Sequence, residues 1–187
     1  MDLLFGIIVG IGLAASCGFR VFVPMLVMSI AVKSGQLTLA DGWSWIGSWP
    51  AVISIGVATI IEIVGFYIPW IDHVFDMLAS PAAVVAGILA TAACVSEMSP
   101  FLQWSTAIIA GGGAAGVVQS TTVIARGAST ATTGGFGNFV IATMELVASF
   151  VLSLLAVVVP IIAGLVLCLV VFWVVRVYRR RRAARAL

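Results

Sequence analysis

Four charged residues lie inside long apolar runs of this chain, where a lipid bilayer would penalise them. They are Arg20, Glu62, Arg126 and Glu145. A charge at bilayer depth costs on the order of several kcal/mol, so such residues usually serve a purpose. Arg20 can pair with Glu62 and Arg126 with Glu145 as structural clamps, or a glutamate without a partner can take up a proton and couple proton movement to transport. The residue types allow both alternatives.

A second polar constellation follows Pro69. If this segment is helical, Asp72 and Asp76 are four residues apart and share a face, with His73 beside them. Two carboxylates and an imidazole can bind a divalent metal ion or relay protons. The alternative is that these acids open the next helix, where the helix dipole favours negative charge.

Amide and hydroxyl side chains replace aliphatic ones in the second half of the chain. Gln119 and Thr122 precede Arg126, and Asn138 follows a glycine-rich stretch. Irregular backbone at membrane depth survives only where it is buried in protein or lines a watery cavity. These residues therefore predict the lining of a polar vestibule, although the part after Ser129 also suits an ordinary loop.

Two breaks in the helices are expected. Pro24 follows Arg20 closely, and proline removes a helix hydrogen bond, which favours a bend or an unwound turn near Arg20. A tilted helix with a mild proline kink is the alternative. Near Gly127 the glycines favour a second break.

These residues must be positioned by membrane helices. Of 187 residues, 63% are hydrophobic and 9% are charged, and the mean hydropathy is +1.25. About 20 apolar residues make one span, so the sequence predicts a single all-α transmembrane domain over residues 1–187. The six apolar segments lie near 4–32, 50–69, 79–96, 104–125, 138–158 and 160–178.

Basic residues at the C-terminal end predict the orientation. Arginines cluster in and just before a tail at 179–187, which is typical of a cytoplasmic segment that meets anionic lipid. With six spans both termini are cytoplasmic, and the loop at 33–49 is external. A binding arm for nucleic acid is not expected.

The chain also divides into two similar halves, 4–97 and 104–178. Gly12–Ser16 resembles Gly112–Gly116, and the segment around Glu62 resembles the one around Glu145. Three spans in each half would insert in opposite directions, as in transporters built from inverted repeats with a site at the midplane. The predicted fold is therefore two inverted three-helix repeats.

These residues together resemble the bacterial and plant membrane family known as domain of unknown function 4126. The resemblance rests on Gly18-Phe19-Arg20 with Pro24, Trp45–Ser48, Glu62, Ile68–Asp76, Arg126, Gly137-Asn138 and Glu145. Members of the family carry Asp and Lys where this chain has Phe66 and Tyr67, and His and Lys where it has Gln119 and Thr122. The resemblance implies a less charged site here and brings no activity with it.

We expect a channel or transporter in the bacterial inner (plasma) membrane that moves an ion or small solute through a midplane cluster. That cluster comprises Arg20, Glu62, Arg126, Glu145, Gln119, Thr122 and Asn138. No catalytic motif is present, so an enzyme is not expected, and neither is a cofactor beyond a bound cation. A chain this small favours a homo-oligomer. The alternatives are a metal-dependent membrane enzyme using Asp72, His73 and Asp76, or a non-catalytic assembly factor.

Overall fold

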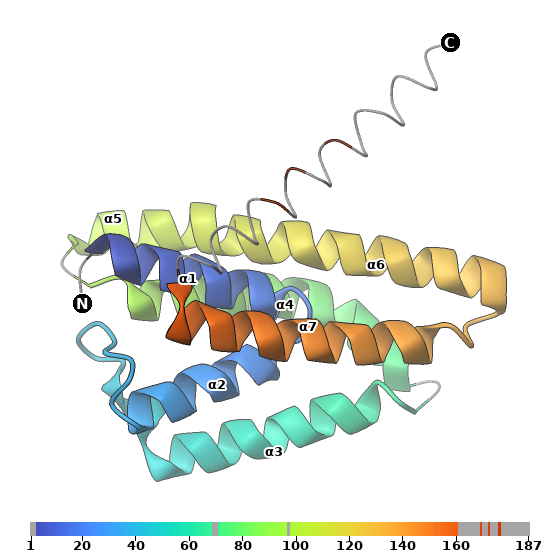
Figure 1. The fold of residues 1–187 in the computed structure, drawn as a ribbon, viewed down its shortest axis with the longest axis horizontal. Helices are drawn as coiled ribbons and strands as arrows, with labels where there is room; N and C mark the ends of the chain where they lie inside the picture. Colours follow the sequence, from blue (N-terminus) through green and yellow to red (C-terminus); the bar gives the residue numbers. More distant parts are fainter. Residues whose placement is uncertain are drawn as a thin grey trace.

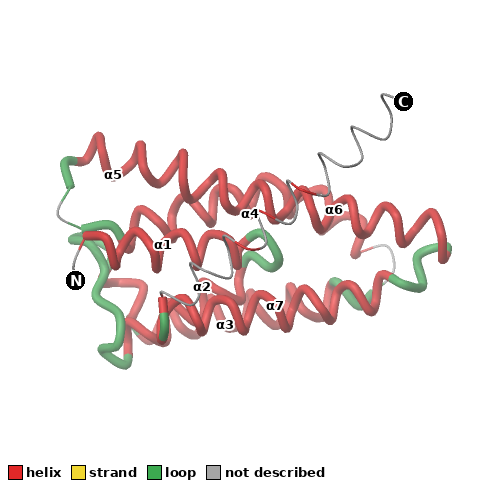
Figure 2. Tube along the Cα trace, turned by 45° about the horizontal axis from the view of Figure 1, so that its top comes forward, coloured by secondary structure: helices red, strands yellow, loops and turns green. Residues whose placement is uncertain are grey.

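The computed structural model describes residues 3–68, 71–96 and 98–160, together with 169, 172 and 176, and within them the side chains of 71–73 are not described. Every regular element in this part of the chain is a helix (Figures 1 and 2). The helices are α1 (Leu3–Cys17), α2 (Phe22–Lys33), the 3₁₀ helix η1 (Ser44–Gly47), α3 (Trp49–Gly65), α4 (Ile71–Cys94), α5 (Pro100–Thr106), the π-helix η2 (Ala107–Gly112), α6 (Gly113–Thr133) and α7 (Asn138–Val158). The predicted all-helical fold is confirmed. Most of the predicted span at 160–178, and the tail at 179–187, lie outside the described residues.

Helix ends follow local sequence signals. Ser48 and Ser99 cap the first turns of α3 and α5 with their hydroxyl oxygens, and a proline follows each of them in the first turn. Gly134 ends α6 in the left-handed conformation, at φ 63°, that glycine adopts without strain.

Three helical stretches are long and apolar enough to cross a membrane. They are Val74–Cys94, the continuous run Pro100–Thr133 and Asn138–Val158, whereas α1, α2 and α3 are apolar but shorter. Large aliphatic side chains such as Ile60, Ile109 and Val140 are more than 60% exposed on the outer faces of these helices. The chain is therefore a helical membrane protein.

Helices α1 and α2 form a hairpin rather than one span. Gly10 of α1 packs on Thr91 near the end of α4, and Leu26 of α2 lies against Gly56 of α3. At the same end of the bundle, the backbone N–H of Ala40 donates to the carbonyl of Ala93 at 2.8 Å. The start of α1 and the loop at 34–48 therefore share one end of the molecule, on the left in Figure 1.

The tip of this hairpin lies about halfway along the bundle. Gly18 meets Ala115 and Val118, which are near the middle of the rod 100–133. With 15 and 12 residues, α1 and α2 are about 22 and 18 Å long, against a hydrocarbon core of about 30 Å. Each helix is thus shorter than this core, and the unwound tip is buried in protein inside the bundle; the pair is called the re-entrant hairpin.

This hairpin corrects the prediction for segment 4–32. The expected break near Arg20 is present, between Cys17 and Phe22. The segment does not cross the bundle, however, because the chain turns back at the break. The start of α1 and the loop at 34–48 lie at the same end of the bundle, whereas the sequence predicted the N-terminus and the loop at 33–49 on opposite sides of the membrane.

The predicted break near Gly127 is also wrong, because α6 continues without interruption to Thr133. The hydroxyls of Ser120, Thr121 and Thr132 each donate to a carbonyl one turn back in the same helix, so they need no partner outside it. The irregular part of this rod is the π-helix η2, where Gly111 lies against Gly87 and Thr91 of α4.

The two halves therefore differ where the proposed repeat aligned them. Residues 3–33 fold back as a hairpin, while residues 100–133 form one rod from end to end (Figures 1 and 2). In the first half, only α3 and α4 then pass through the bundle. The three spans that the inverted repeat requires in this half are therefore not present among the described residues. The inverted repeat is not confirmed.

Candidate functional site

Arg20 lies at the tip of the re-entrant hairpin and is 2% exposed. Its Nη2 donates to the carbonyl of Ala142 on α7 at 3.0 Å and lies 3.6 Å from Oε2 of Glu145. Its Nε and Nη1 have no hydrogen-bond partner among the described residues. A guanidinium carries five N–H donors, so Arg20 retains capacity for a further acceptor.

Arg126 of α6 binds two carboxylates. Its Nε donates to Oε1 of Glu145 at 3.0 Å and its Nη2 donates to Oε2 of the same residue, which makes a bidentate pair. Its Nη1 donates to Oδ1 of Asp76 on α4 at 3.0 Å. Bidentate arginine–carboxylate pairs are the strongest of such interactions, so helices α4, α6 and α7 are joined here by charge.

The carboxylate of Glu145 therefore lies within ion-pair distance of two arginines. The pairing predicted between Arg126 and Glu145 is present, and the carboxylate within 4 Å of Arg20 is also that of Glu145 rather than that of Glu62. One carboxylate between two guanidiniums does not fully neutralise them, and Asp76 supplies the second negative charge.

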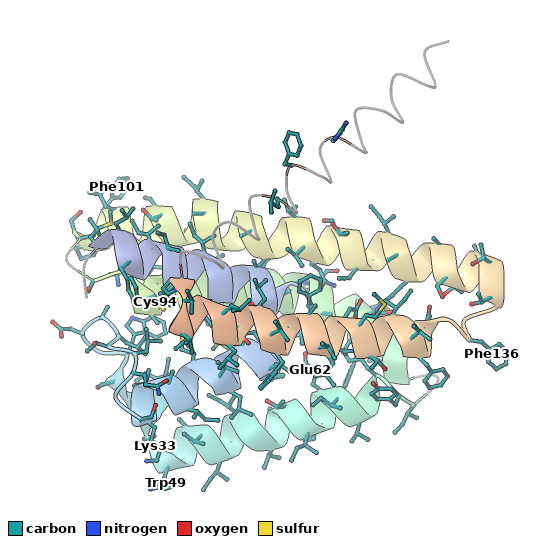
Figure 3. All side chains as sticks on the ribbon, viewed as in Figure 1. Lys33, Trp49, Glu62, Cys94, Phe101 and Phe136 are labelled. Atoms are coloured by element: carbon teal, nitrogen blue, oxygen red, sulfur yellow. The ribbon has the colours of Figure 1, made fainter. Side chains whose placement is uncertain are left out.

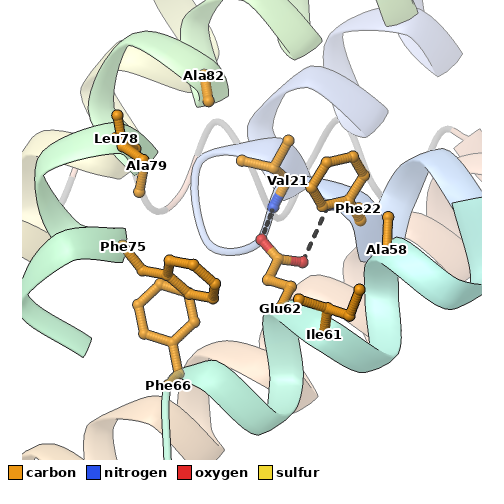
Figure 4. Close-up of a pocket in the computed structure, with 10 residues that line it drawn as sticks. All are labelled: Val21, Phe22, Ala58, Ile61, Glu62, Phe66, Phe75, Leu78, Ala79 and Ala82. Carbon is orange, nitrogen blue, oxygen red and sulfur yellow. Dashed lines mark hydrogen bonds between the residues drawn. The ribbon is translucent and has the colours of Figure 1, made fainter. Parts of the chain in front are cut away.

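Glu62 of α3 is bound in another way. Its Oε1 accepts from the backbone N–H of Val21 at 2.7 Å and its Oε2 accepts from that of Phe22 at 3.0 Å (Figure 4). These groups open α2, so Glu62 caps that helix from outside and meets the positive end of its dipole. Both buried glutamates thus bind the hairpin tip, one through its backbone and one through Arg20.

Phe66 joins the two arginines from the end of α3. The guanidinium carbon of Arg20 lies 3.7 Å from the centre of its ring, and that of Arg126 lies 4.5 Å from it. Cations are attracted to the face of an aromatic ring. This role of Phe66 was not predicted from the sequence, because a phenylalanine in an apolar stretch does not by itself indicate a charged partner.

A cavity of about 560 Å³, lined by both polar and apolar side chains, lies beside Arg126 between α4, α6 and the start of α7. Its lining comprises Asp76, Met77, Ser80, Val123, Arg126, Gly127, Thr130, Ala131 and Asn138. Asn138 donates through Nδ2 to Oγ1 of Thr130 at 3.2 Å, while its Oδ1 has no partner among the described residues. Of the residues predicted to line a polar vestibule, Arg126 and Asn138 line this cavity, whereas Gln119 and Thr122 are not in its lining.

The remaining predicted site residues lie near this cavity or outside the described part. Gln119 donates to Ser80 Oγ at 3.4 Å, whereas Thr122 donates to the carbonyl of Gln119 within its own helix. The side chains of Asp72 and His73 are not described, so the predicted metal site with Asp76 is untested. Among described residues, no group of three His, Cys, Asp or Glu side chains is placed to hold a metal.

Comparison with known proteins gives a family but no activity. The family model described as a domain of unknown function (DUF4126) matches residues 7–180. No curated protein and no solved structure matches the chain. Because the match covers nearly the whole sequence, including the hairpin, the arginines and both buried glutamates, the chain belongs to the family of domain of unknown function 4126.

Proposed function

We propose that this protein is a small channel or transporter that moves an ion or small polar solute across the membrane. One observation supports the proposal: a cavity is lined by Arg126 and Asp76, and Arg126 shares the Glu145 carboxylate with Arg20 at the tip of the hairpin. Re-entrant backbone and buried charges at membrane depth are typical of solute pathways.

The shared carboxylate suggests how a solute would bind. Glu145 binds Arg126 through two oxygens and lies 3.6 Å from Arg20, so it can neutralise either guanidinium. An acceptor group on a solute can replace it at one arginine while Glu145 stays on the other. The unused Nε and Nη1 of Arg20 offer donors for such a group.

The packed hairpin would form the barrier on the other side of the site. Ser149 of α7 donates to the carbonyl of Ser16 at 3.0 Å, and both residues are fully buried. Beyond them, Val9 and Leu13 of α1 are also fully buried. Passage therefore requires the tip to move relative to α7, which would break the Arg20 contacts with Ala142 and Glu145.

The orientation follows from the basic tail. With the arginines of 179–187 in the cytoplasm and a span at 160–178, the cavity opens to the cytoplasm and the loop at 34–48 is external. The start of α1 is then external as well, in place of the cytoplasmic N-terminus expected from six spans. We propose the bacterial inner membrane as the location, a homo-oligomer as the assembly and no cofactor beyond a transported or bound ion.

Cysteine labelling tests this orientation. After Cys17, Cys94 and Cys168 are replaced by serine, a cysteine at Gln36 and one at Leu4 should both react with an impermeant maleimide from outside the cell. A cysteine at Phe136, which is 82% exposed at the opposite end (Figure 3), should react only after the membrane is opened. Labelling of Gln36 and Leu4 from opposite sides would contradict the re-entrant hairpin.

A flux assay tests the function. Proteoliposomes containing the wild type, Glu145→Gln or Asp41→Asn would be compared over a panel of small anions, cations and neutral polar solutes. We expect Glu145→Gln to lower flux at least about tenfold, since a change of 1.4 kcal/mol in a barrier is tenfold in rate. Asp41 is exposed in the external loop, so Asp41→Asn is the matched loss of one carboxylate and should keep wild-type flux. Equal flux in all three proteins would reject the cluster as the pathway.

The assembly-factor alternative is favoured by the same ion pairs. Asp76, Arg126 and Glu145 tie three helices together whether or not a solute passes. A static clamp predicts that replacing all four charges together, Arg20 and Arg126 by Met, Asp76 by Asn and Glu145 by Gln, preserves the function in cells, whereas a solute site predicts its loss.

A further inference from the structure

A second cavity, of about 310 Å³, lies between α3, α4 and the start of α2 (Figure 4). Its walls are apolar except for Glu62, and Phe66 forms part of them. Ile61 and Leu78, which also line it, are 59% and 60% exposed. Because both lie on lipid-facing helices, this cavity faces the hydrocarbon of the bilayer.

Glu62 is the only charged residue that lines this cavity among those described. It is 7% exposed, and its carboxylate accepts two backbone N–H groups, although a carboxylate has about four acceptor positions. No arginine or lysine nitrogen of the described residues lies within 4.0 Å of it. Its charge is offset by the start of α2, which is equivalent to roughly half a charge, and by the guanidinium of Arg20, whose nitrogens lie more than 4.0 Å away.

Aromatic rings complete the wall. Phe22 and Phe75 line the cavity together with Phe66, and Figure 4 shows the rings of Phe66 and Phe75 beside the Glu62 carboxylate. Phe66 already has two guanidiniums over its ring, so Phe22 and Phe75 are the rings that can attract a bound cation, most strongly where water is excluded. Apolar walls, aromatic rings and one incompletely compensated carboxylate together suit a ligand that is both hydrophobic and positively charged.

We propose that this cavity binds a lipophilic monovalent cation, such as a quaternary ammonium or phosphonium compound, which enters from the bilayer between α3 and α4. Its hydrocarbon groups would fill the apolar walls and its charge would lie near Glu62. A lipid acyl chain would fill the same volume but would leave the carboxylate without a positive partner. The proposal does not depend on transport through the arginine cluster, since Phe66 stands between the two sites.

Direct binding tests the proposal. The protein would be placed in nanodiscs of zwitterionic phosphatidylcholine, and binding of radiolabelled methyltriphenylphosphonium would be measured by equilibrium dialysis, with empty nanodiscs subtracted. We expect saturable binding by the wild type, at least about tenfold weaker binding by Glu62→Gln, and unchanged binding by the exposed-site control Asp41→Asn. Neutral triphenylphosphine oxide should compete at least about tenfold less well than the cation.

A steric variant locates the site. Ala79 lines the cavity from α4, so Ala79→Trp should fill it and abolish binding while Glu62 keeps its backbone partners. Thermal unfolding of each variant in nanodiscs establishes that it is folded. The proposal is overturned by an absence of saturable binding to the wild type, by full binding to folded Ala79→Trp or Glu62→Gln, or by equal competition from the neutral compound, which would indicate a lipid-chain site.

Discussion

Glu62 and Glu145 are the same residue type, are similarly buried at 7% and 5%, and both bind the tip of one hairpin. They are nevertheless held by different chemistry. Glu62 accepts backbone N–H groups at the start of α2, while Glu145 accepts from Arg126 and lies beside Arg20. A helix N-terminus offers about half a positive charge and two guanidiniums offer two. The comparison teaches that a buried carboxylate seen in a sequence does not reveal whether its partner is a side chain or a helix end.

The largest difference between them should appear on removal of each carboxylate. Glu145→Ala leaves Arg20 and Arg126 buried without their shared partner, and breaking a buried ion pair in this way costs roughly 3–5 kcal/mol. Glu62→Ala removes a cap, which costs about 0.5–2 kcal/mol. Unfolding in mixed micelles at increasing denaturing detergent would measure both. Equal losses would mean that the two carboxylates are compensated alike.

The fold was partly predictable from the sequence because its signals are local. The apolar segments, the break before Pro24 and the caps at Ser48 and Ser99 follow from residue type and spacing. The direction of α2, which folds back along α1, does not follow from local signals, because a helix break does not determine which way the next helix runs. That direction is set by contacts with distant residues, such as Leu26 with Gly56 and Ala40 with Ala93.

The candidate site shows the same limit. Arg20, Glu62, Arg126 and Glu145 could be chosen because a charge within an apolar run is visible in one dimension. Their pairing could not, since Arg20 meets Glu145 across more than a hundred residues. In the Gly127 region, the rule that glycine and hydroxyl residues break helices was outweighed by the hydrogen bonds those hydroxyls make within α6.

Double-mutant cycles on the arginine–glutamate pairs should show the next largest difference between the two glutamates. For Arg126→Met and Glu145→Gln we expect a coupling energy of about 2–3 kcal/mol, as is typical of residues in direct contact within one network. For Arg20→Met and Glu62→Gln we expect a smaller coupling energy, below about 1 kcal/mol, because the pair interacts through its charges but makes no hydrogen bond and has no nitrogen–oxygen distance within 4.0 Å. Detergent unfolding of the single and double variants gives both values. A large coupling for Arg20 with Glu62 would return the pairing to the one first expected from the sequence.

The smallest expected change in stability is that of Phe66 variants. Phe66 lines the cavity at Glu62 and also contacts the two arginines that lie near Glu145. Phe66→Leu removes the ring that faces both guanidiniums and should cost about 1–2 kcal/mol, since each desolvated cation–π contact contributes roughly that order. Phe75→Leu is the matched control, because Phe75 packs edge-on against Phe66 at 5.5 Å, lines the same apolar cavity and has no guanidinium over its ring. The loss from Phe66→Leu should shrink when Arg20 is already Met, while that from Phe75→Leu should not change. If both variants lose the same stability in both backgrounds, Phe66 contributes packing alone, and the two glutamates lie in electrostatically separate surroundings.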